Sequence, residues 1–447
     1  MLHAHLGRQA VVIGAGIGGL AAAGALSELF DRVVVLERDN LPSEATPRPG
    51  APQGRHLHGL LAGGHQALCA LFPDLEKDLA RAGAIPVRVS RDFCENGPES
   101  DRPRRDLGWS AYMLSRPLIE LVIRGALARL PNVTVQPQCR VTALLATPDG
   151  RRVVGARYAA PGSSEETIAA DFVVDVSGRG FPTLALLQAI NRPRPREMEI
   201  GVDLSYATAI FSVPRSQRFD WSVVLTHADA PHHGRRGVLC PIEHNRWMVT
   251  LVGRGAEQPP AELDGFMAYA ERLAKPTIHD AIRNAKPIGD IARFGFPASV
   301  RRYFDADTIP DRLIVMGDAL CRLNPAYGQG MSVAACEALL LKRVLLTRRD
   351  EREPLDGVSV LFHAQAQSVI DGPWQLAALP DFAYPCTRGQ RPDDFEQTLR
   401  FSAAMRRLAF HDPAVDRLMT EVAHLLKPLS AYQDPELLRR VGAELTA

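Results

Sequence analysis

The sequence lacks an excess of charge of either sign. Its 447 residues include 52 Lys and Arg against 51 Asp and Glu, which leaves a formal net charge of +1 at pH 7. Nucleic-acid-binding domains and acidic disordered tails both carry a strong excess of one sign. The balance therefore argues against both classes, and we expect no nucleic-acid partner.

Long hydrophobic runs are also absent. The best candidate for a long hydrophobic run, residues 10–26, is interrupted by five glycines and leads directly into charged sequence. A membrane-spanning helix needs about 20 mainly apolar residues. Hydrophobic residues make up 46% of the chain and charged residues 23%, which is typical of globular proteins. We therefore expect a soluble globular protein with no integral membrane segment and no targeting sequence.

Paired cysteines and metal-ligand patterns are missing as well. The seven cysteines are an odd number, and none forms a C-x-x-C pair or a zinc-ligand spacing. This usage favours reduced thiols and a cytoplasmic location. His56, His58 and His65 have no carboxylate at ligand spacing, so we expect no metal site. No G-x-S-x-G element supports a hydrolase.

The N-terminal region, in contrast, has a clear pattern. Residues 10–13 predict a short strand, the Ala/Leu-rich segment that follows predicts a helix to about residue 30, and residues 32–36 predict a second strand. Together they form one βαβ unit.

Three glycines connect the first strand to the helix in the spacing Gly14-x-Gly16-x-x-Gly19, and Glu37 follows at the end of the second strand. Gly14 permits a tight turn, Gly16 lets a pyrophosphate approach the backbone, and Gly19 permits close helix packing. The helix N-terminus attracts phosphate, and Glu37 would bind ribose hydroxyls. The pattern is a dinucleotide fingerprint that does not distinguish FAD from NAD.

Later segments predict two further kinds of structure. Residues 171–176 and 313–316 are short apolar runs typical of buried parallel strands. Residues 198–255 alternate with period 2, which predicts an antiparallel sheet with one covered face. Helical spacing dominates from about Met331 onward.

A second motif lies far from the first. Gly317-Asp318 directly follows the strand at 313–316, and residues 324–331, Asn-Pro-Ala-Tyr-Gly-Gln-Gly-Met, open a helix. With both motifs in this order, the chain resembles FAD-dependent monooxygenases of the p-hydroxybenzoate hydroxylase fold. Within that group it is most similar to bacterial polyether-type flavin epoxidases and squalene-epoxidase-like enzymes. The matching segments are residues 52–58, 115–117, 202–208, 317–331 and 371–374.

The resemblance implies an α/β fold with three parts. The first is a GR2-type Rossmann-like FAD-binding domain built from discontinuous segments, the second an antiparallel-sheet substrate domain, and the third a C-terminal helical segment. The expected boundaries are 1–80, 110–185 and 290–345 for the FAD-binding domain, 81–109 and 186–289 for the substrate domain, and 346–447 for the helical segment.

The resemblance also implies where FAD binds. Arg38 follows Glu37 near the adenosine ribose, and the backbone of Val141 contacts the adenine. Arg48 and Arg55 flank the flavin-side crossover, while Arg116 contacts the diphosphate or the ribityl chain. The implied cofactor-binding residues are Gly14, Gly16, Ile17, Gly19, Glu37, Arg38, Arg48, Arg55, Arg116, Val141, Gly317, Asp318, Pro325, Gly328, Gly330 and Met331.

The same resemblance assigns the flavin side of the site. Gly317 and Asp318 contact the ribityl chain, and the loop with Pro325, Gly328, Gln329 and Gly330 lies beside the isoalloxazine. No catalytic side chain is implied, because the flavin drives the chemistry. The backbone of the loop and the helix N-terminus would favour the anionic reduced flavin.

One departure concerns electron supply. Where related hydroxylases carry a middle Asp-Gly motif, this chain retains Asp171 but has Ser177 in place of the second aspartate, and no second G-x-G-x-x-G occurs. Direct reduction by NAD(P)H is therefore in doubt. The expected electron source is transiently bound NAD(P)H or a separate flavin reductase as partner.

The function that the resemblance implies is monooxygenation. Reduced FAD and O₂ would form a C4a-hydroperoxyflavin that gives one oxygen atom to an apolar, polyketide- or terpenoid-like substrate, by alkene epoxidation or hydroxylation. Two alternatives are a flavin-dependent dehydrogenase or reductase of a prenyl-type substrate and a non-catalytic flavin or lipid-binding module. Halogenation is disfavoured because the Trp-x-Trp-x-Ile-Pro motif of flavin halogenases is missing.

Overall fold

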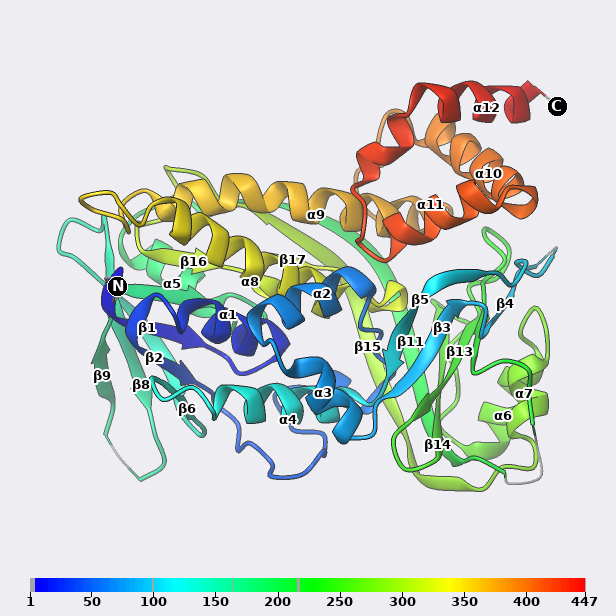
Figure 1. Cartoon of the computed structure of the whole chain (residues 1–447), viewed down its shortest axis with the longest axis horizontal. Helices are drawn as coiled ribbons and strands as arrows, with labels where there is room; N and C mark the ends of the chain where they lie inside the picture. The colour runs from blue at the N-terminus through cyan, green and yellow to red at the C-terminus, as the bar shows by residue number, and fades with distance from the viewer. Residues whose placement is uncertain (1–4, 99, 163, 215–217, 447) are drawn as a thin grey trace.

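A parallel sheet of five strands forms the centre of the fold (Figure 1), as described by a computed structural model for residues 5–98, 100–162, 164–214 and 218–446. Its strands lie in the order β16 (Leu313–Val315), β10 (Phe172–Asp175), β1 (Gly7–Ile13), β2 (Phe30–Leu36) and β6 (Val133–Gln136). Val11, Val34 and Val173 at its centre are fully buried. Such continuous apolar runs are expected where a parallel sheet is covered on both faces.

Helix α1 (Ile17–Leu26) connects β1 to β2 and completes the predicted βαβ unit. Every residue of α1 is buried, and α8 (Gly330–Thr347) packs against it. The helix ends before residue 30 because Phe30 already belongs to β2, where its ring stacks on that of Phe172 with the centroids 5.7 Å apart.

A second, seven-stranded sheet lies at the other end of the molecule (Figure 1). Its order is β17 (Cys321–Arg322), β15 (Pro287–Tyr303), β11 (Arg196–Ser212), β14 (Arg246–Arg254), β13 (Arg236–Ile242), β12 (Val223–Thr226) and β4 (Phe93–Asn96). All neighbours are antiparallel except β12 and β4. The antiparallel sheet predicted between residues 198 and 255 is therefore present.

Both faces of this second sheet are covered, although the sequence predicted only one. Ala207, Val249 and Leu251 pack in one apolar cluster under α6 (Leu263–Glu271) and α7 (Thr277–Ile282). Tyr206 and Val252, on the opposite face, pack with the core of the parallel sheet. This inward face therefore joins the two halves of the molecule.

The remaining elements surround the two sheets. They are η1 (Pro52–Arg55), α2 (Ala62–Leu71), α3 (Leu75–Arg81), β3 (Ile85–Ser90), β5 (Asp106–Met113), α4 (Arg116–Leu127), β7 (Arg140–Ala146), β8 (Val153–Ala159), β9 (Glu166–Ala169), α5 (Phe181–Ala189), η2 (Gly317–Ala319) and η3 (Pro325–Tyr327). Strand β15 begins in the predicted substrate part and ends in the predicted cofactor part, and we keep the three-part division of the chain as a proposal.

The C-terminal region is helical, as its spacing predicts. It comprises α9 (Val358–Phe382), α10 (Phe395–His411), α11 (Pro413–Ala423), η4 (Leu429–Gln433) and α12 (Pro435–Thr446). Helices α10 to α12 form a group beyond the end of α9 (Figure 1). Buried Asp416 holds this group to the rest of the chain, because Arg102 and Arg105 pair with its carboxylate at 2.6 and 3.1 Å.

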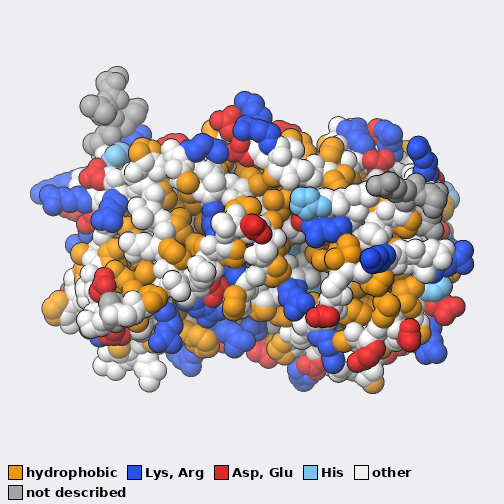
Figure 2. Space-filling view, turned by 90° about the horizontal axis from the view of Figure 1, so that it is seen from below, with side chains coloured by type: hydrophobic (Ala, Val, Ile, Leu, Met, Phe, Trp, Pro, Cys, Tyr) orange, Lys and Arg blue, Asp and Glu red, His pale blue; other side chains and the backbone are white. Residues whose placement is uncertain are grey.

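The surface agrees with the balanced composition. Figure 2 shows Lys and Arg side chains interspersed with Asp and Glu and with hydrophobic side chains over one face of the molecule. In the part of the chain that the structure describes, no helix combines the length and the apolar character that crossing a membrane requires. The α/β fold class with a parallel-sheet domain, separate antiparallel sheets and C-terminal helices is confirmed.

Candidate active site

The glycine loop after β1 has the geometry of a phosphate cradle. Gly14 has φ of +100°, and a Cβ there would lie 2.7 Å from the carbonyl oxygen of Val176. A Cβ on Gly19 would collide with the carbonyl of Gly14. No side chain caps α1 at Gly16, so its first N–H groups remain available for an anion. The loop residues therefore fit the diphosphate of FAD.

Glu37 is buried at the end of β2 and holds this loop. Its carboxylate accepts hydrogen bonds from the backbone N–H groups of Ala15 (2.6 Å) and Asp39 (3.0 Å). The Cys139 N–H donates to the Glu37 carbonyl at 2.7 Å, which brings Val141, two residues further along, to this end of the site. The arrangement fits the predicted adenosine end, where Glu37 would reach the ribose.

Arg48 is a buried partner of Glu37 and not a solvated surface charge. Its guanidinium lies 3.3 Å from Glu37, 2.7 Å from Asp39 and 3.1 Å from Glu120. These carboxylates raise the pKa of Arg48 against the opposing effect of its burial. The resemblance implies a flavin-side position for Arg48, whereas the structure packs it beside Glu37.

Arg116 lies between the glycine loop after β1 and the Gly317-Asp318 motif. It begins α4, and its Nη2 atom is 3.8 Å from the place of a Cβ on Gly16. Its Nε donates to Glu120 at 3.1 Å, which links Arg116 to the cluster around Arg48. A guanidinium beside the glycine loop is suited to a diphosphate, and the predicted contact of Arg116 with FAD stays a prediction that this position fits.

His58 fixes the direction in which Arg116 points. Its Nδ1 lies 2.9 Å from the carbonyl of His56, which can only accept, so Nδ1 carries the proton. The free Nε2 then accepts from Nη1 of Arg116 at 3.2 Å. Burial lowers the pKa of His58 to about 3, and the charge of Arg116 adds to this effect, so the imidazole stays neutral.

Gly317 and Asp318 turn the chain after β16 toward Arg116. Gly317 has φ of +62°, and Asp318 is exposed although Gly317 and Ala319 on either side are buried. Desolvation by the surrounding protein raises the pKa of the Asp318 carboxyl, and the positive charges of Arg116 and Arg322 oppose that shift. The two distant motifs are thus brought together at Arg116, which lies beside Gly16 and interacts electrostatically with Asp318.

Glu337 supports the second motif from within α8. Its Oε2 accepts the N–H of Gly317 at 2.6 Å, and its buried Oε1 has no hydrogen-bond partner. Burial raises its pKa from the usual 4.5 to about 8, so the carboxyl is protonated at neutral pH. Sequence reasoning did not single out this residue, because a glutamate within a helix is usually solvated.

We expect Glu337→Gln to stabilise the protein at alkaline pH. Between about pH 5 and 8 the folded state keeps a proton that the unfolded state releases, so the free energy of unfolding falls as pH rises, by up to about 1.4 kcal/mol per pH unit. Glutamine is uncharged, like the protonated carboxyl, so the variant loses this dependence of the free energy of unfolding on pH. Urea denaturation at pH 5, 6.5 and 8 measures it; parallel stability curves for the two proteins would contradict the prediction.

The loop before α8 is held by its own side chains. Asn324 is fully buried, and its Oδ1 accepts the Ala326 N–H at 2.9 Å. Gly328 has φ of +67° and donates to the Pro325 carbonyl at 3.0 Å. Gln329 is buried at the N-terminus of α8 with Oε1 unpartnered. The loop therefore presents backbone and the start of α8, as its predicted role beside the isoalloxazine requires.

The structure adds residues that sequence reasoning missed. Asp381 of α9 is buried, accepts hydrogen bonds from Asn324 Nδ2 (2.9 Å) and from the Tyr327 hydroxyl (3.0 Å), and pairs with Arg254 of β14. Tyr206 of β11 lies on the same inward sheet face. The only sequence signal for Asp381 was the matching segment at 371–374, ten residues earlier.

Arg38 and Arg55 are exposed, and their predicted contacts with FAD stay predictions. One residue lies away from this arrangement. Asp171, which the sequence relates to a flavin motif, accepts the backbone N–H groups of Arg8 (2.7 Å) and Gln9 (3.0 Å) at the start of β1, the end opposite Gly14. That interpretation of Asp171 is wrong, because its carboxylate binds backbone N–H groups at the amino end of the central strands.

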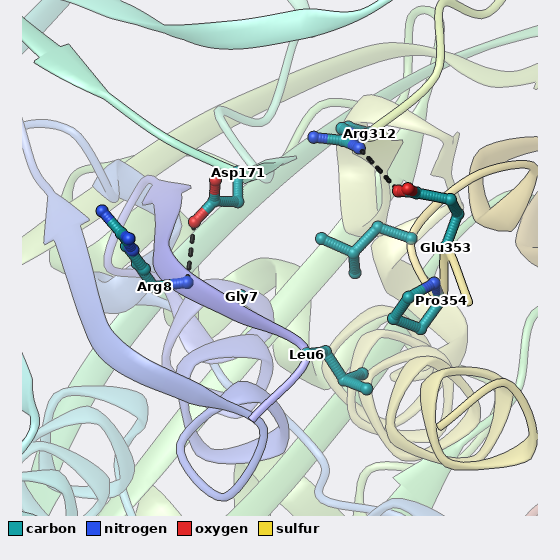
Figure 3. A pocket seen from close by; sticks show the side chains of 8 residues that line it. Leu6, Gly7, Arg8, Asp171, Arg312, Glu353 and Pro354 are labelled. Carbon is teal, nitrogen blue, oxygen red and sulfur yellow. Dashed lines mark hydrogen bonds and ion pairs between the residues drawn. The ribbon is translucent and has the colours of Figure 1, made fainter. Parts of the chain in front are cut away.

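A cavity of about 270 Å³ lies at this same end of the strands. Figure 3 shows Asp171 and Arg8 on one side of it and Arg312 facing Glu353 on the other. The Arg312 guanidinium is 4.0 Å from Glu353. This cavity is therefore separate from the nucleotide loop, which lies at the carboxyl end of β1.

Comparisons with known proteins agree with the site. A family model described as FAD binding domain matches residues 8–354. Protein Rv3254 of Mycobacterium tuberculosis is 34% identical over 407 residues, covering 86% of this chain and 83% of that protein. Kynurenine 3-monooxygenase of Salinispora tropica is 26% identical over 374 residues, covering 78% and 74%. The structure of the flavin-dependent brominase Bmp2 superimposes with a TM-score of 0.68 at 15% identity, covering 98% and 99%.

The fold and the site define an FAD-dependent oxidoreductase. The chain belongs to the FAD binding domain family, whose model covers most of its length, and its relatives include a kynurenine 3-monooxygenase. The similarity to Bmp2 shows the fold alone, and the expectation against halogenation stays a prediction.

Proposed function

We propose that the protein is an FAD-dependent monooxygenase that transfers one oxygen atom from O₂ to an apolar, polyketide- or terpenoid-like substrate, by alkene epoxidation or hydroxylation. The observation that carries the proposal is the contact between the loop before α8 and the inward face of the seven-stranded sheet, made by Asp381 with Tyr327 and Arg254. This contact would bring a substrate held on the sheet next to the flavin ring. The kynurenine 3-monooxygenase relative supports the reaction class.

In this proposal, different residues of the chain bind each part of FAD and shield the substrate from water. Gly16 and Arg116 bind the diphosphate, Glu37 the ribose, and Asp318 the ribityl chain. When bound, FAD supplies the redox and oxygen-activating chemistry. The loop at Gly328 places the N-terminus of α8, with its positive dipole end, beside the flavin ring. Tyr206 and Phe294 on the sheet, whose ring centroids are 6.2 Å apart, would help to exclude water from the substrate.

The test is reoxidation of the reduced holoenzyme. The FAD-loaded protein is reduced under anaerobic conditions and mixed with O₂ in a stopped-flow spectrometer. A monooxygenase shows a transient absorbance that differs from both reduced and oxidised FAD. Reoxidation without a transient, together with flavin reduction by a prenyl-type substrate, would indicate a dehydrogenase or reductase. Flavin that no reductant or substrate turns over would indicate a non-catalytic binding module.

We expect NADPH alone to reduce the enzyme slowly, since we propose that a separate flavin reductase supplies the electrons. Ser177 replaces the second aspartate of the middle motif, and its buried hydroxyl has no partner. Stopped-flow mixing of oxidised enzyme with NADPH, with and without substrate, measures the bleaching of FAD. Fast bleaching with no reductase present would overturn the proposed partner and establish direct use of NADPH.

A further inference from the structure

Residues 57–61 connect η1 to α2 and belong to neither a helix nor a strand. Without the regular hydrogen bonds of such an element, a segment keeps one conformation only if other groups hold it. Its position matters because His58 lies within it and binds Nη1 of Arg116. Whatever holds this segment therefore also decides where Arg116 points.

Two threonines of the seven-stranded sheet, opposite each other on β11 and β14, hold the start of the segment. Oγ1 of Thr208 lies 2.8 Å from Nδ1 of His56 and 2.8 Å from Oγ1 of Thr250. Thr250 Oγ1 in turn accepts the N–H of Leu57 at 3.3 Å. His56, Thr208 and Thr250 are 5%, 2% and 4% exposed. These are thus buried hydrogen bonds between parts of the chain that lie 152 and 193 residues apart.

The hydrogen bonds run in one direction along these groups. Burial lowers the pKa of His56 to about 4, the charge of Arg55 adds to this effect, and a backbone hydrogen bond to Arg293 opposes it. The ring is therefore neutral at pH 7, with one nitrogen that donates and one that accepts. A hydrogen bond that favours the protonated ring is one that the ring donates, so the ring donates to Arg293 and Nδ1 accepts from Thr208. The Thr208 oxygen then accepts from the hydroxyl of Thr250.

The path continues through the backbone of His56 to Arg116. The carbonyl of His56 accepts from Nδ1 of His58 at 2.9 Å, and Nε2 of His58 accepts from Nη1 of Arg116 at 3.2 Å. Glu120 holds Nε of the same guanidinium at 3.1 Å. With Nε and Nη1 held, Nη2 lies beside Gly16, 3.8 Å from the place of its Cβ. A continuous path of hydrogen bonds thus joins the sheet to the glycine loop.

We infer that Thr208 and Thr250 are positioning residues for FAD: they hold His56 in place and, through His58, aim Arg116 at the diphosphate. A hydroxyl buried in a sheet costs free energy unless it is hydrogen-bonded, and valine would fill nearly the same space without that cost. What the two hydroxyls provide is a fixed place for the segment that carries His58. The inference rests on the proposed contact of Arg116 with FAD and does not depend on the reaction that follows.

The experiment titrates FAD into the full-length protein from which the cofactor has been removed, and follows binding by calorimetry. Thr208→Val should weaken FAD binding about 3- to 10-fold, as expected for one lost hydrogen bond between neutral groups. Thr208→Ser keeps the hydroxyl and should bind FAD as the parent does. Thr250→Val, one step further from Arg116, should cause a smaller loss, and it replaces Thr208→Val in the cycle below if that variant does not fold.

A double-mutant cycle with Arg116→Met separates positioning from packing. Arg116→Met alone should weaken FAD binding about 10- to 100-fold, since it removes a charged hydrogen bond to the diphosphate. Adding Thr208→Val should cause no further loss, because no guanidinium remains to be aimed. A packing defect, in contrast, would lower FAD affinity equally with and without Arg116.

Thr226→Val is the matched control. Thr226 is a fully buried threonine of β12 in the same sheet, and its hydroxyl lies 3.4 Å from Oδ1 of Asn96, away from the path to Arg116. The substitution removes one buried hydroxyl from the sheet without touching that path. It should leave FAD affinity unchanged, whether or not the melting temperature falls.

Three results would overturn the inference. Equal losses in Thr208→Ser and Thr208→Val would show that the hydroxyl is not the group that matters. Additive losses in the cycle would show that Thr208 acts independently of Arg116. Unchanged FAD affinity in Arg116→Met would remove the contact on which the inference rests. The proposed oxygen transfer is tested separately by reoxidation, so reoxidation without a transient would overturn the monooxygenase and leave this path to Arg116 intact.

Discussion

Gly328→Val is expected to reduce oxygen transfer by on the order of 100-fold or to leave the protein without FAD. Gly328 adopts φ of +67°, a left-handed conformation that costs a residue with a Cβ about 1–2 kcal/mol and a β-branched one more. A Cβ there would lie 3.8 Å from the backbone nitrogen of Gly59, so the added methyl groups would enter the space between the loop and Gly59. Product formation and bound FAD per protein are the quantities to measure.

Gly162→Val is the matched control for Gly328→Val. Gly162 has φ of +74° in the connection between β8 and β9, and no atom outside its neighbours lies within 4 Å of its Cβ position. The backbone strain is thus similar and the location different. An unchanged rate and FAD content in Gly328→Val would refute the loop assignment, as would an equal loss of activity in Gly162→Val.

Glu37→Ala is expected to weaken FAD binding by at least 10- to 100-fold. A charged hydrogen bond to the ribose contributes about 1.5–3 kcal/mol. The structure adds a second cost, because the same carboxylate orders the glycine loop through Ala15 and lies 3.3 Å from Arg48. Release of FAD, followed by the rise of its fluorescence on dilution, measures the change.

Glu37→Gln separates the two contributions. Glutamine can still accept the Ala15 N–H but lacks the charge that faces Arg48, so its FAD affinity should fall between those of the parent and Glu37→Ala. Glu44→Ala, at an exposed carboxylate nearby, should behave as the parent. Retention of FAD by Glu37→Ala as tight as in the parent would show that the ribose assignment is wrong.

The sequence predicted the elements that are set by local pattern. The strand, glycine turn and helix at residues 10–26 are encoded by adjacent residues, and so is the turn at Gly317. Buried parallel strands are recognisable because they are apolar throughout. The end of α1 was predicted too late, because the burial of Phe30 against Phe172 is a tertiary contact that helix propensity does not register.

Residues whose role depends on distant partners could not be predicted. The burial of Arg48 depends on Glu120, 72 positions away, which supplies its third carboxylate at 3.1 Å. Period 2 marks alternate faces of β11, but both faces are apolar, since Leu204 and Tyr206 pack inward while Ala207 packs under α6 and α7, so the pattern alone could not identify the face that meets the flavin loop. Asp381 belongs to no local motif, and only the position of α9 brings it to the flavin loop.

The order of strands in the central sheet has a consequence for how the protein is made. Neighbouring strands β1, β10 and β16 come from residues 7–13, 172–175 and 313–315. A nascent chain on the ribosome therefore cannot complete the cofactor cradle until β16 and α8 have emerged, and pairing such distant segments is slow. FAD can only be captured late, after most of the chain has been synthesised. Because a ligand that binds the native state shifts the folding equilibrium, the supply of FAD during expression should govern the yield of folded protein.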